Sequence, residues 1–169
     1  TVITRILKES RFDPSLLELE ITESAALRNA ELTQDVLRRL VDMGIRIAID
    51  DFGTGYSSLT YLKQFPIQAV KIDRSFVRDL ATDQNDAVIA TAIINMAHIL
   101  DLSVVAEGVE TQDQLDFIKA KGCDEFQGYL LAKPMPASGL TTVLTNLNAA
   151  GPRVRPRNGA EPAATGRVR

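Results

Sequence analysis

The sequence predicts an α/β fold in which parallel strands alternate with helices, and three observations lead to it. Apolar runs typical of strands recur five times between Leu17 and Leu131, each followed by a helical pattern. Strands separated by helices pair in parallel through right-handed crossovers. Every predicted strand ends in an acidic or other polar residue, which suits the mouth of a (β/α) barrel better than the rival fold, an open doubly wound sheet.

The predicted elements follow one another in a regular order. Residues 1–10 have the pattern of the end of a helix whose own strand is not in the sequence. Alternating apolar residues predict strands at Leu17–Thr22, Ile45–Asp50, Gln68–Asp73, Ser103–Glu107 and Glu125–Leu131. Helical periodicity predicts helices at Glu31–Met43, Ser57–Gln64, Asp86–Leu100, Gln112–Lys121 and Ala137–Leu147.

Local signals explain where several of these helices begin and end. Gly44 is a C-terminal stop for the helix over residues 31–43. Pro66 requires the short helix before it to end. Thr111 and Gln114 have the spacing of a capping box, and Gly122 follows the helix that they begin.

The number of strand–helix units is too small for a complete barrel. Each unit takes about 27 residues, and an eight-unit barrel needs about 200 residues or more, whereas the chain has 169. We therefore expect residues 1–150 to form the last five units of a barrel. Residues 151–169 hold five arginines, three prolines and almost no large apolar residue, which predicts a disordered basic tail.

Charge, apolar runs and cysteine content indicate which ligands the protein can bind and in which compartment it works. The tail carries a net charge of +4 and the chain −3, so residues 1–150 carry −7 and make a poor surface for a nucleic-acid polymer. No run approaches the roughly 18 apolar residues of a membrane span, so no membrane contact is expected from this segment. The single cysteine, Cys123, fits a reducing compartment, and we expect a cytoplasmic domain. His98 lies on an apolar helical pattern and is interpreted as structural.

Polar side chains near the strand ends are predicted to point to the inside of the barrel. Because strand side chains alternate, one polar residue of each strand points to the inside of the predicted barrel, and these residues are Glu20, Asp50, Lys71, Glu107 and Gln127. Three acids with a lysine and an amide predict a shell for divalent metals and an anionic phosphate. The alternative for any one of them is an ordinary internal ion pair. Glu18 and Arg46 lie one layer deeper and are expected to pair structurally.

Five sequence runs, in this order, resemble the EAL-domain cyclic di-GMP phosphodiesterases. The runs are EITES at 20–24, DDFGTGYSSL at 50–59, VKID at 70–73, AEGVE at 106–110 and QGY at 127–129. The resemblance covers residues 1–147, and it is the set of motifs together that is specific.

The resemblance implies a TIM-like barrel that holds two Mg²⁺ or Mn²⁺ ions and hydrolyses cyclic di-GMP to linear pGpG in bacterial signalling. By position, Glu20 resembles a ligand of the first metal, Asp50 the carboxylate that bridges both ions, and Asp51 a ligand of the second. Glu107 resembles a metal or water ligand and general base. Lys71 resembles the lysine that orients the attacking water.

The resemblance also implies supporting residues around this centre. Gln127 and Asp73 are similar to residues that bind substrate or water. Glu23 resembles the acid that anchors the loop containing Gly53 and Gly55.

The family's Glu-Ala-Leu signature, an arginine and an asparagine ligand belong to three units that this sequence lacks. The chain alone is therefore expected to be inactive, within a parent protein expected to be a homodimer with upstream sensor or GGDEF domains. An alternative is a non-catalytic EAL-fold receptor for cyclic di-GMP or a protein-interaction module. A third reading is a barrel enzyme acting on another metal-bound phosphate or enol.

Overall fold

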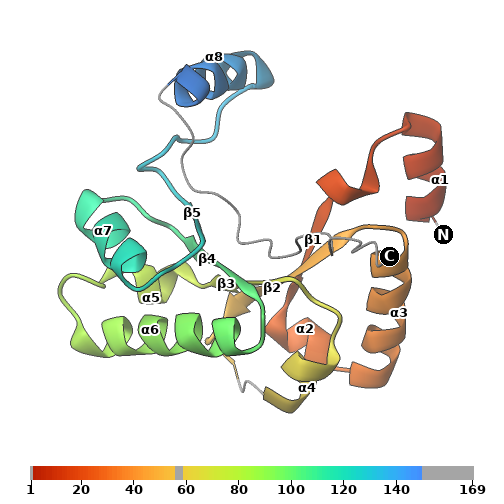
Figure 1. Cartoon of the computed structure of the whole chain (residues 1–169), viewed down its shortest axis with the longest axis horizontal. Helices are drawn as coiled ribbons and strands as arrows, with labels where there is room; N and C mark the ends of the chain where they lie inside the picture. Colours follow the sequence, from red (N-terminus) through yellow and green to blue (C-terminus); the bar gives the residue numbers. More distant parts are fainter. Residues whose placement is uncertain (1, 56–58, 150–169) are drawn as a thin grey trace, which may run out of the picture. The chain divides into compact units, whose positions relative to one another are not determined.

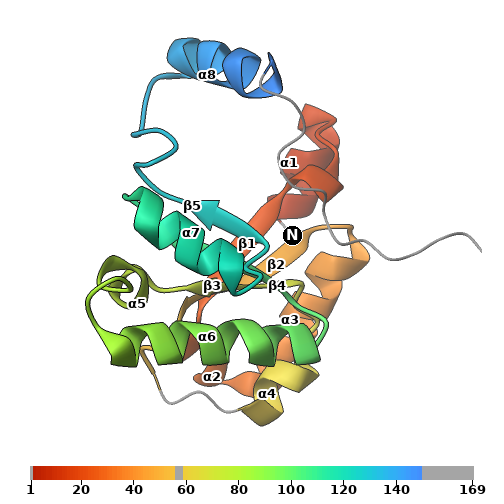
Figure 2. The ribbon, with the colours of Figure 1, turned by 60° about the vertical axis from the view of Figure 1, so that its left-hand side comes forward.

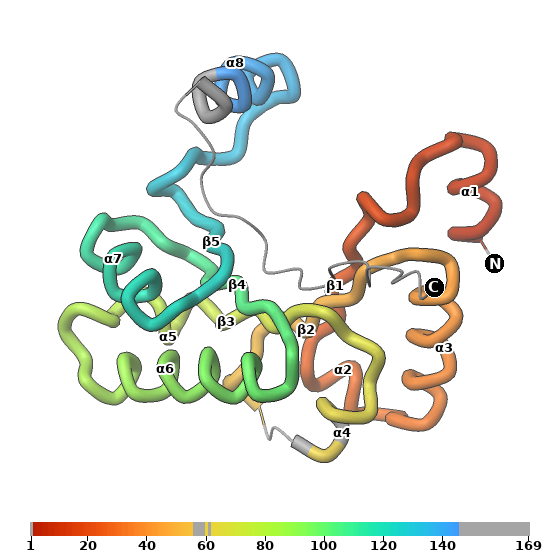
Figure 3. The backbone as a smooth tube through the Cα atoms, in the orientation of Figure 1, coloured from red at the N-terminus to blue at the C-terminus, as the bar shows by residue number. Residues whose placement is uncertain are grey.

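A computed structural model of the chain describes residues 2–55 and 59–149, in which strands and helices alternate (Figures 1 and 3). The strands are β1 (Glu18–Thr22), β2 (Arg46–Phe52), β3 (Ala69–Ile72), β4 (Ser103–Glu107) and β5 (Glu125–Gln127). The helices are α1 (Val2–Ser10), the 3₁₀ helix η1 (Pro14–Leu16), α2 (Glu23–Leu27), α3 (Ala30–Asp42), α4 (Leu59–Gln64), α5 (Arg74–Arg78), α6 (Gln84–Ile99), α7 (Gln112–Ala120) and α8 (Ala137–Ala149).

The chain divides into two compact units, Thr1–Lys133 and Pro134–Arg169. The first unit contains the sheet with α1 to α7, and the second contains α8. The predicted basic tail, residues 151–169, lies outside the described residues. Within the part of the chain that is described, no helix combines the length and apolarity that crossing a bilayer requires.

The five strands form one parallel sheet in the order β1-β2-β3-β4-β5 (Figure 1). This confirms the predicted parallel α/β architecture. Each strand pairs with the next one along the chain, so the connecting segments with their helices cross over in the same direction. Because the strands are parallel, their carboxyl ends meet at one edge of the sheet, and that edge carries the polar residues of interest.

The core of the first unit lies between the sheet and its helices (Figure 2). Helix α6 packs against β3 and β4, and α5 packs against β4. Helix α2 packs against β1 and β2, and α3 packs against β2. The apolar strand residues that face these helices are almost completely buried, among them Ile47, Ile49, Val70, Ile72 and Val104. Burial of a side chain of this size stabilises the fold by about 1.5–3 kcal/mol, so the packed layer fixes the strand ends in space.

Helices α2, α5 and η1 were not predicted. With only three to five residues each, they are too short to show a helical period. The signals that could have revealed α2 and α5 are their N-caps, since Thr22 accepts a hydrogen bond from the Ala25 amide and Asp73 accepts one from the Ser75 amide. The predicted helix over 57–64 is present as α4, and its first two residues lie outside the described residues.

Two predicted strand ends were wrong by two residues or more. Strand β2 continues to Phe52, so Asp50 and Asp51 lie within it, with an irregular register between Ile49 and Phe52. Strand β5 ends at Gln127 rather than at residue 131. A Cβ atom on Gly128 would lie 2.1 Å from the Val109 carbonyl oxygen, and after this close approach the chain turns, with the Leu131 amide bonded to the Gly128 carbonyl.

Candidate metal centre

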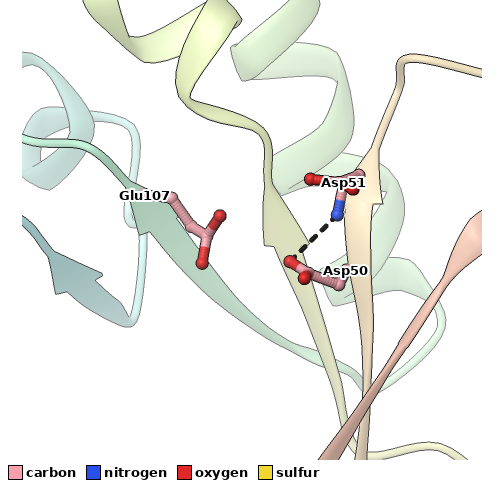
Figure 4. A group of neighbouring side chains, drawn as sticks. All are labelled: Asp50, Asp51 and Glu107. Carbon is pink, nitrogen blue, oxygen red and sulfur yellow. Dashed lines mark hydrogen bonds between the residues drawn. The ribbon is translucent and has the colours of Figure 1, made fainter.

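Three carboxylates from two strands meet at the carboxyl edge of the sheet. Asp50 and Asp51 come from β2 and Glu107 from β4, and one oxygen of each lies within 4.8 Å of the others. Figure 4 shows the Asp50 and Glu107 carboxylates turned toward each other across the end of β3. Oxygen atoms at this spacing suit a hard divalent cation.

The backbone at the end of β2 makes this grouping possible. Consecutive residues of a regular strand point to opposite faces, so Asp50 and Asp51 would normally diverge. Asp51 instead has φ = 53°, in the left-handed region, and its amide donates to Asp50 Oδ1 at 3.0 Å (Figure 4). Gly53 follows with φ = 97°. A non-glycine residue in this conformation is uncommon and is often found at functional sites.

Lys71 lies among the acids, although it comes from β3. Its side chain is almost completely buried, and Nζ is 2.5 Å from Oε1 of Glu20 and 2.5 Å from Oε1 of Glu107. Asp50 Oδ1 is 3.7 Å away. Burial of the ammonium opposes its charge, but the hydrogen bonds to Glu107 and Glu20 and the surrounding negative charge outweigh burial and raise the pKa of Lys71. The lysine is therefore charged and balances part of the acidic cluster.

Two acids of the centre, Glu107 and Asp51, are held in an environment that opposes their ionisation. Burial is the main cause that raises the pKa of Glu107, and the charges of Asp50 and Glu20 add to it, against the lowering effect of Lys71. The pKa of Asp51 is raised by burial and by the charges of Asp50 and Asp73. One ammonium thus leaves the carboxylates under-compensated, which is the electrostatic condition that a divalent cation relieves. The donor set fits such an ion.

Asp73 lies at the next strand end and begins α5. Its carboxylate accepts hydrogen bonds from the Ser75 amide, at 3.0 Å, and from the Ser75 hydroxyl. Burial raises the pKa of Asp73, but these bonds outweigh burial and lower it. The negative charge of Asp73 is one of the causes that raise the pKa of Asp51.

The remaining predicted site residues lie around this cluster. Of the five predicted inward residues, Glu20, Asp50, Lys71 and Glu107 lie together. Gln127 pairs with Glu107 in the parallel register, and its side chain is exposed. Glu20 contacts Lys71 and is not one of the three clustered carboxylates.

Glu23 faces the glycine-containing loop after β2. It is buried, with 6% of its surface exposed, and neither carboxylate oxygen has a hydrogen-bond partner among the described residues. A Cβ atom on Gly55 would lie 3.4 Å from Glu23 Oε2. Residues 56–58 follow and are not described. The Glu23 carboxylate is thus next to the loop that it is predicted to anchor.

Phe76 and Ile93 shape the same loop and were missed. A Cβ atom on Gly53 would lie 3.0 Å from Phe76 Cε2 and 3.1 Å from Ile93 Cδ1. Phe76 belongs to α5, which is too short to show a helical period, so its position could not be anticipated.

Ionic groups outside the centre make structural contacts. Arg46 Nε lies 3.4 Å from Glu18 Oε2, which confirms the predicted pair. His98 Nε2 lies 2.9 Å from Asp124 Oδ2, and that oxygen also accepts the Val104 amide, so His98 joins α6 to the segment before β5. Burial raises the pKa of Cys123 to about 12, which makes its thiol unreactive.

Comparison with known proteins finds relatives that match most of this chain. The sequence model of the EAL domain matches residues 1–134. The bifunctional diguanylate cyclase/cyclic di-GMP phosphodiesterase MucR of Pseudomonas aeruginosa is 49% identical over 140 residues, which are 83% of this chain and 20% of MucR. The chain spans about a fifth of the length of the curated relatives that it matches first.

Solved structures of related proteins also match most of this chain. The MucR phosphodiesterase in complex with cyclic di-GMP has a TM-score of 0.79 and 48% identity, covering 82% of this chain and 56% of that one. The Klebsiella pneumoniae BlrP1 complex with manganese and cyclic di-GMP has a TM-score of 0.73 and 32% identity, covering 79% of this chain and 34% of that one. These similarities confirm the predicted barrel-type fold.

Proposed function

This chain belongs to the EAL domain family, and on that premise we propose that it carries the metal centre of a phosphodiesterase that hydrolyses cyclic di-GMP to linear pGpG. One observation carries the proposal: the oxygens of Asp50, Asp51 and Glu107 converge within 4.8 Å at the carboxyl edge of the sheet, beside a buried lysine. The names of the relatives agree with it, since MucR is named a cyclic di-GMP phosphodiesterase and its solved structure is a cyclic di-GMP complex.

We propose that the centre holds two Mg²⁺ or Mn²⁺ ions. Asp50, Asp51 and Glu107 are hard oxygen donors, and Glu20 adds a fourth carboxylate from β1. BlrP1, which was solved as a manganese complex, supports this choice. When bound, such ions lower the pKa of a coordinated water and neutralise phosphate oxygens.

The residues of the chain then have separate roles in hydrolysis. Lys71 donates to the attacking water and orients it, because its ammonium is already held among the acids of the centre. Glu107 accepts the proton of that water, and its raised pKa suits a general base. The water oxygen forms a bond to phosphorus as one ester P–O bond breaks. The leaving oxygen takes a proton from solvent, and Glu107 returns the proton that it accepted to solvent. One such cleavage opens the cyclic dinucleotide to pGpG.

We assign the surrounding residues to binding and to loop position. Gln127 lies beside Glu107 in the sheet register, where its amide reaches water or a phosphate oxygen, and Asp73 lies at the neighbouring strand end. Glu23 anchors the loop with Gly53 and Gly55 by means of its buried carboxylate.

We also infer the setting of the reaction. Cyclic di-GMP is a bacterial second messenger, so the domain works on the cytoplasmic side. A homodimer and upstream sensor or GGDEF domains are further proposals, and the name of MucR, which combines a cyclase with the phosphodiesterase, supports the second of these.

The test is a turnover assay with the purified full-length protein and cyclic di-GMP. We expect pGpG to accumulate with Mn²⁺ or Mg²⁺ and to stop forming when EDTA is added, as followed by anion-exchange chromatography. Binding of cyclic di-GMP without any product, at saturating metal, would overturn the proposed hydrolysis and support a receptor role.

A further inference from the structure

Gln114 is a buried polar residue whose side-chain amide bonds to three backbone groups. Only 5% of its surface is exposed. Its Oε1 atom accepts the amide of Glu110 at 2.7 Å and that of Thr111 at 2.9 Å. Its Nε2 atom donates to the Arg78 carbonyl at 2.8 Å. A buried side chain with three good bonds is costly to replace, because each lost partner leaves a buried polar group unpaired.

The three bonds join two segments that are far apart in sequence. Glu110 and Thr111 belong to the loop after β4, residues 108–111, whereas Arg78 is the last residue of α5. The same segments touch at a second point, since a Cβ atom on Gly108 would lie 2.7 Å from the Cβ of Arg74. Gly108 has φ = 70°, which allows the loop to come this close. The loop after β4 is therefore tied to both ends of α5.

Each tied segment begins next to a residue of the metal centre. The loop after β4 follows Glu107 directly, and α5 follows Asp73, two residues after Lys71. The distance of 2.5 Å between Lys71 Nζ and Glu107 Oε1 depends on the relative position of these strand ends. The hydrogen bond from Gln114 Nε2 to the Arg78 carbonyl, which we call the tie, connects the segments just beyond these strand ends. It therefore limits how far the two strand ends can separate.

We propose that Gln114 is a positioning residue for the metal centre, holding the Glu107 strand end against the Lys71–Asp73 strand end through the Arg78 carbonyl. This inference rests on the proposed function, because it assigns Gln114 a part in metal binding. The bond to Arg78 is separate from helix capping: the bonds to Glu110 and Thr111 complete the start of α7, whereas the Arg78 bond reaches a different helix.

A pair of variants separates the tie from the cap. Gln114→Glu, in its ionised form, keeps an acceptor for both amides but has no donor for the Arg78 carbonyl, so the tie is lost. Thr111→Ala is the matched control. It removes the other half of the same capping box, which is the hydrogen bond from the Gln114 backbone N–H to the Thr111 hydroxyl oxygen, and it leaves the tie. Gln114→Met is a second variant without a buried charge, in case the glutamate prevents folding.

Two readouts are measured in the full-length protein at a temperature at which all variants are folded. Amide hydrogen exchange reports the tie itself. We expect faster exchange in residues 74–78 in both Gln114 variants and wild-type exchange there in Thr111→Ala. The Kd for Mn²⁺ reports the effect on the centre. We expect a roughly tenfold weaker Kd in the Gln114 variants, the low end of what changes around a metal site cause, and no change in the control.

The outcomes distinguish this inference from the proposed function. Equal exchange and equal Mn²⁺ affinity in the Gln114 variants and in Thr111→Ala would overturn the positioning role. Faster exchange at α5 with unchanged Mn²⁺ affinity would overturn it as well and leave Gln114 purely structural. A wild-type protein that binds no Mn²⁺ would instead overturn the proposed metal centre, and exchange at α5 would still decide whether the tie exists.

Discussion

The Nζ atom of Lys71, on β3, lies 2.5 Å from the Oε1 atom of Glu107, on β4. The same ammonium reaches Glu20 on β1, so one buried cation joins acids from strands that are not neighbours in the sheet. Removing one partner of a buried ion pair is costly because the other charge is left uncompensated. Lys71 therefore serves the acidic cluster as an internal counter-charge.

Replacing this counter-charge with an apolar side chain should make the fold depend on metal. Lys71→Met is expected to lower the free energy of unfolding by about 2 kcal/mol without metal, less than the roughly 3–5 kcal/mol of a fully buried pair because Glu20 is half-exposed. Added Mn²⁺ should raise the Tm of the variant more than that of the wild type, since the ion replaces the lost positive charge. A smaller rise in the variant than in the wild type would contradict this role.

The pH dependence of metal binding follows from the raised pKa values of Asp51 and Glu107. A metal ligand must be deprotonated, so lowering the pH weakens Mn²⁺ binding, and here the loss begins at a higher pH than for ordinary carboxylates. Asp73→Asn removes a charge that raises the pKa of Asp51 and keeps an N-cap for α5. The fall in Mn²⁺ affinity should then move to lower pH, as measured by titration at a series of pH values.

The control for this experiment is a substitution of a second aspartate, Asp79. Asp79 pairs with Arg78 at 2.7 Å and is not among the groups that shift the pKa of Asp51. Asp79→Asn should leave the pH profile unchanged. Equal profiles for Asp73→Asn and the wild type would show that Asp73 does not act on the centre.

The grouping of four polar side chains at one edge was predictable, because strand side chains have a period of two and parallel strands end at one edge. These two facts are enough to bring Glu20, Asp50, Lys71 and Glu107 together. Alternation alone sends Asp51 to the other face, and the resemblance assigned it to the second metal. Asp51 joins the cluster because its own φ is left-handed and the strand register is irregular between Ile49 and Phe52. Neither feature is encoded in a propensity pattern.

The missed parts of the fold depend on contacts between distant segments. Strand β5 stops where Gly128 meets the backbone of Val109, a contact that the local sequence of 125–131 does not show. Helix α5 has five residues, fewer than two turns, and its place is set by the core and by Gln114. Periodicity predicts long elements well, whereas short ones are decided by tertiary contacts.

Replacing Gly53 with even the smallest side chain should destabilise the protein. It has φ = 97°, and a Cβ atom there would lie 3.0 Å from Phe76 Cε2. Gly53→Ala is therefore expected to lower the free energy of unfolding by about 1–3 kcal/mol and to weaken Mn²⁺ binding, because Asp51 is two residues away.

Gly139 provides the matched substitution. It lies in α8, where an added Cβ would meet Met135 Sδ at an ordinary contact distance of 3.4 Å. Gly139→Ala should be neutral or stabilise the protein by about 0.5 kcal/mol, since alanine favours a helix. Chemical denaturation of both variants gives the comparison. An equal effect of the two substitutions would show that the loop after β2 is not strained.

The central claim is that Asp50 is a metal ligand on which hydrolysis depends, and one paired measurement tests it most directly. Cyclic di-GMP turnover with Mn²⁺ is compared between Asp50→Asn and Glu18→Gln in the full-length protein, because Glu18 is an acid of the neighbouring strand that pairs with Arg46 outside the centre. We expect Asp50→Asn to reduce turnover by at least about 100-fold with an unchanged fold, and Glu18→Gln to keep it. Undiminished hydrolysis by folded Asp50→Asn would contradict the account.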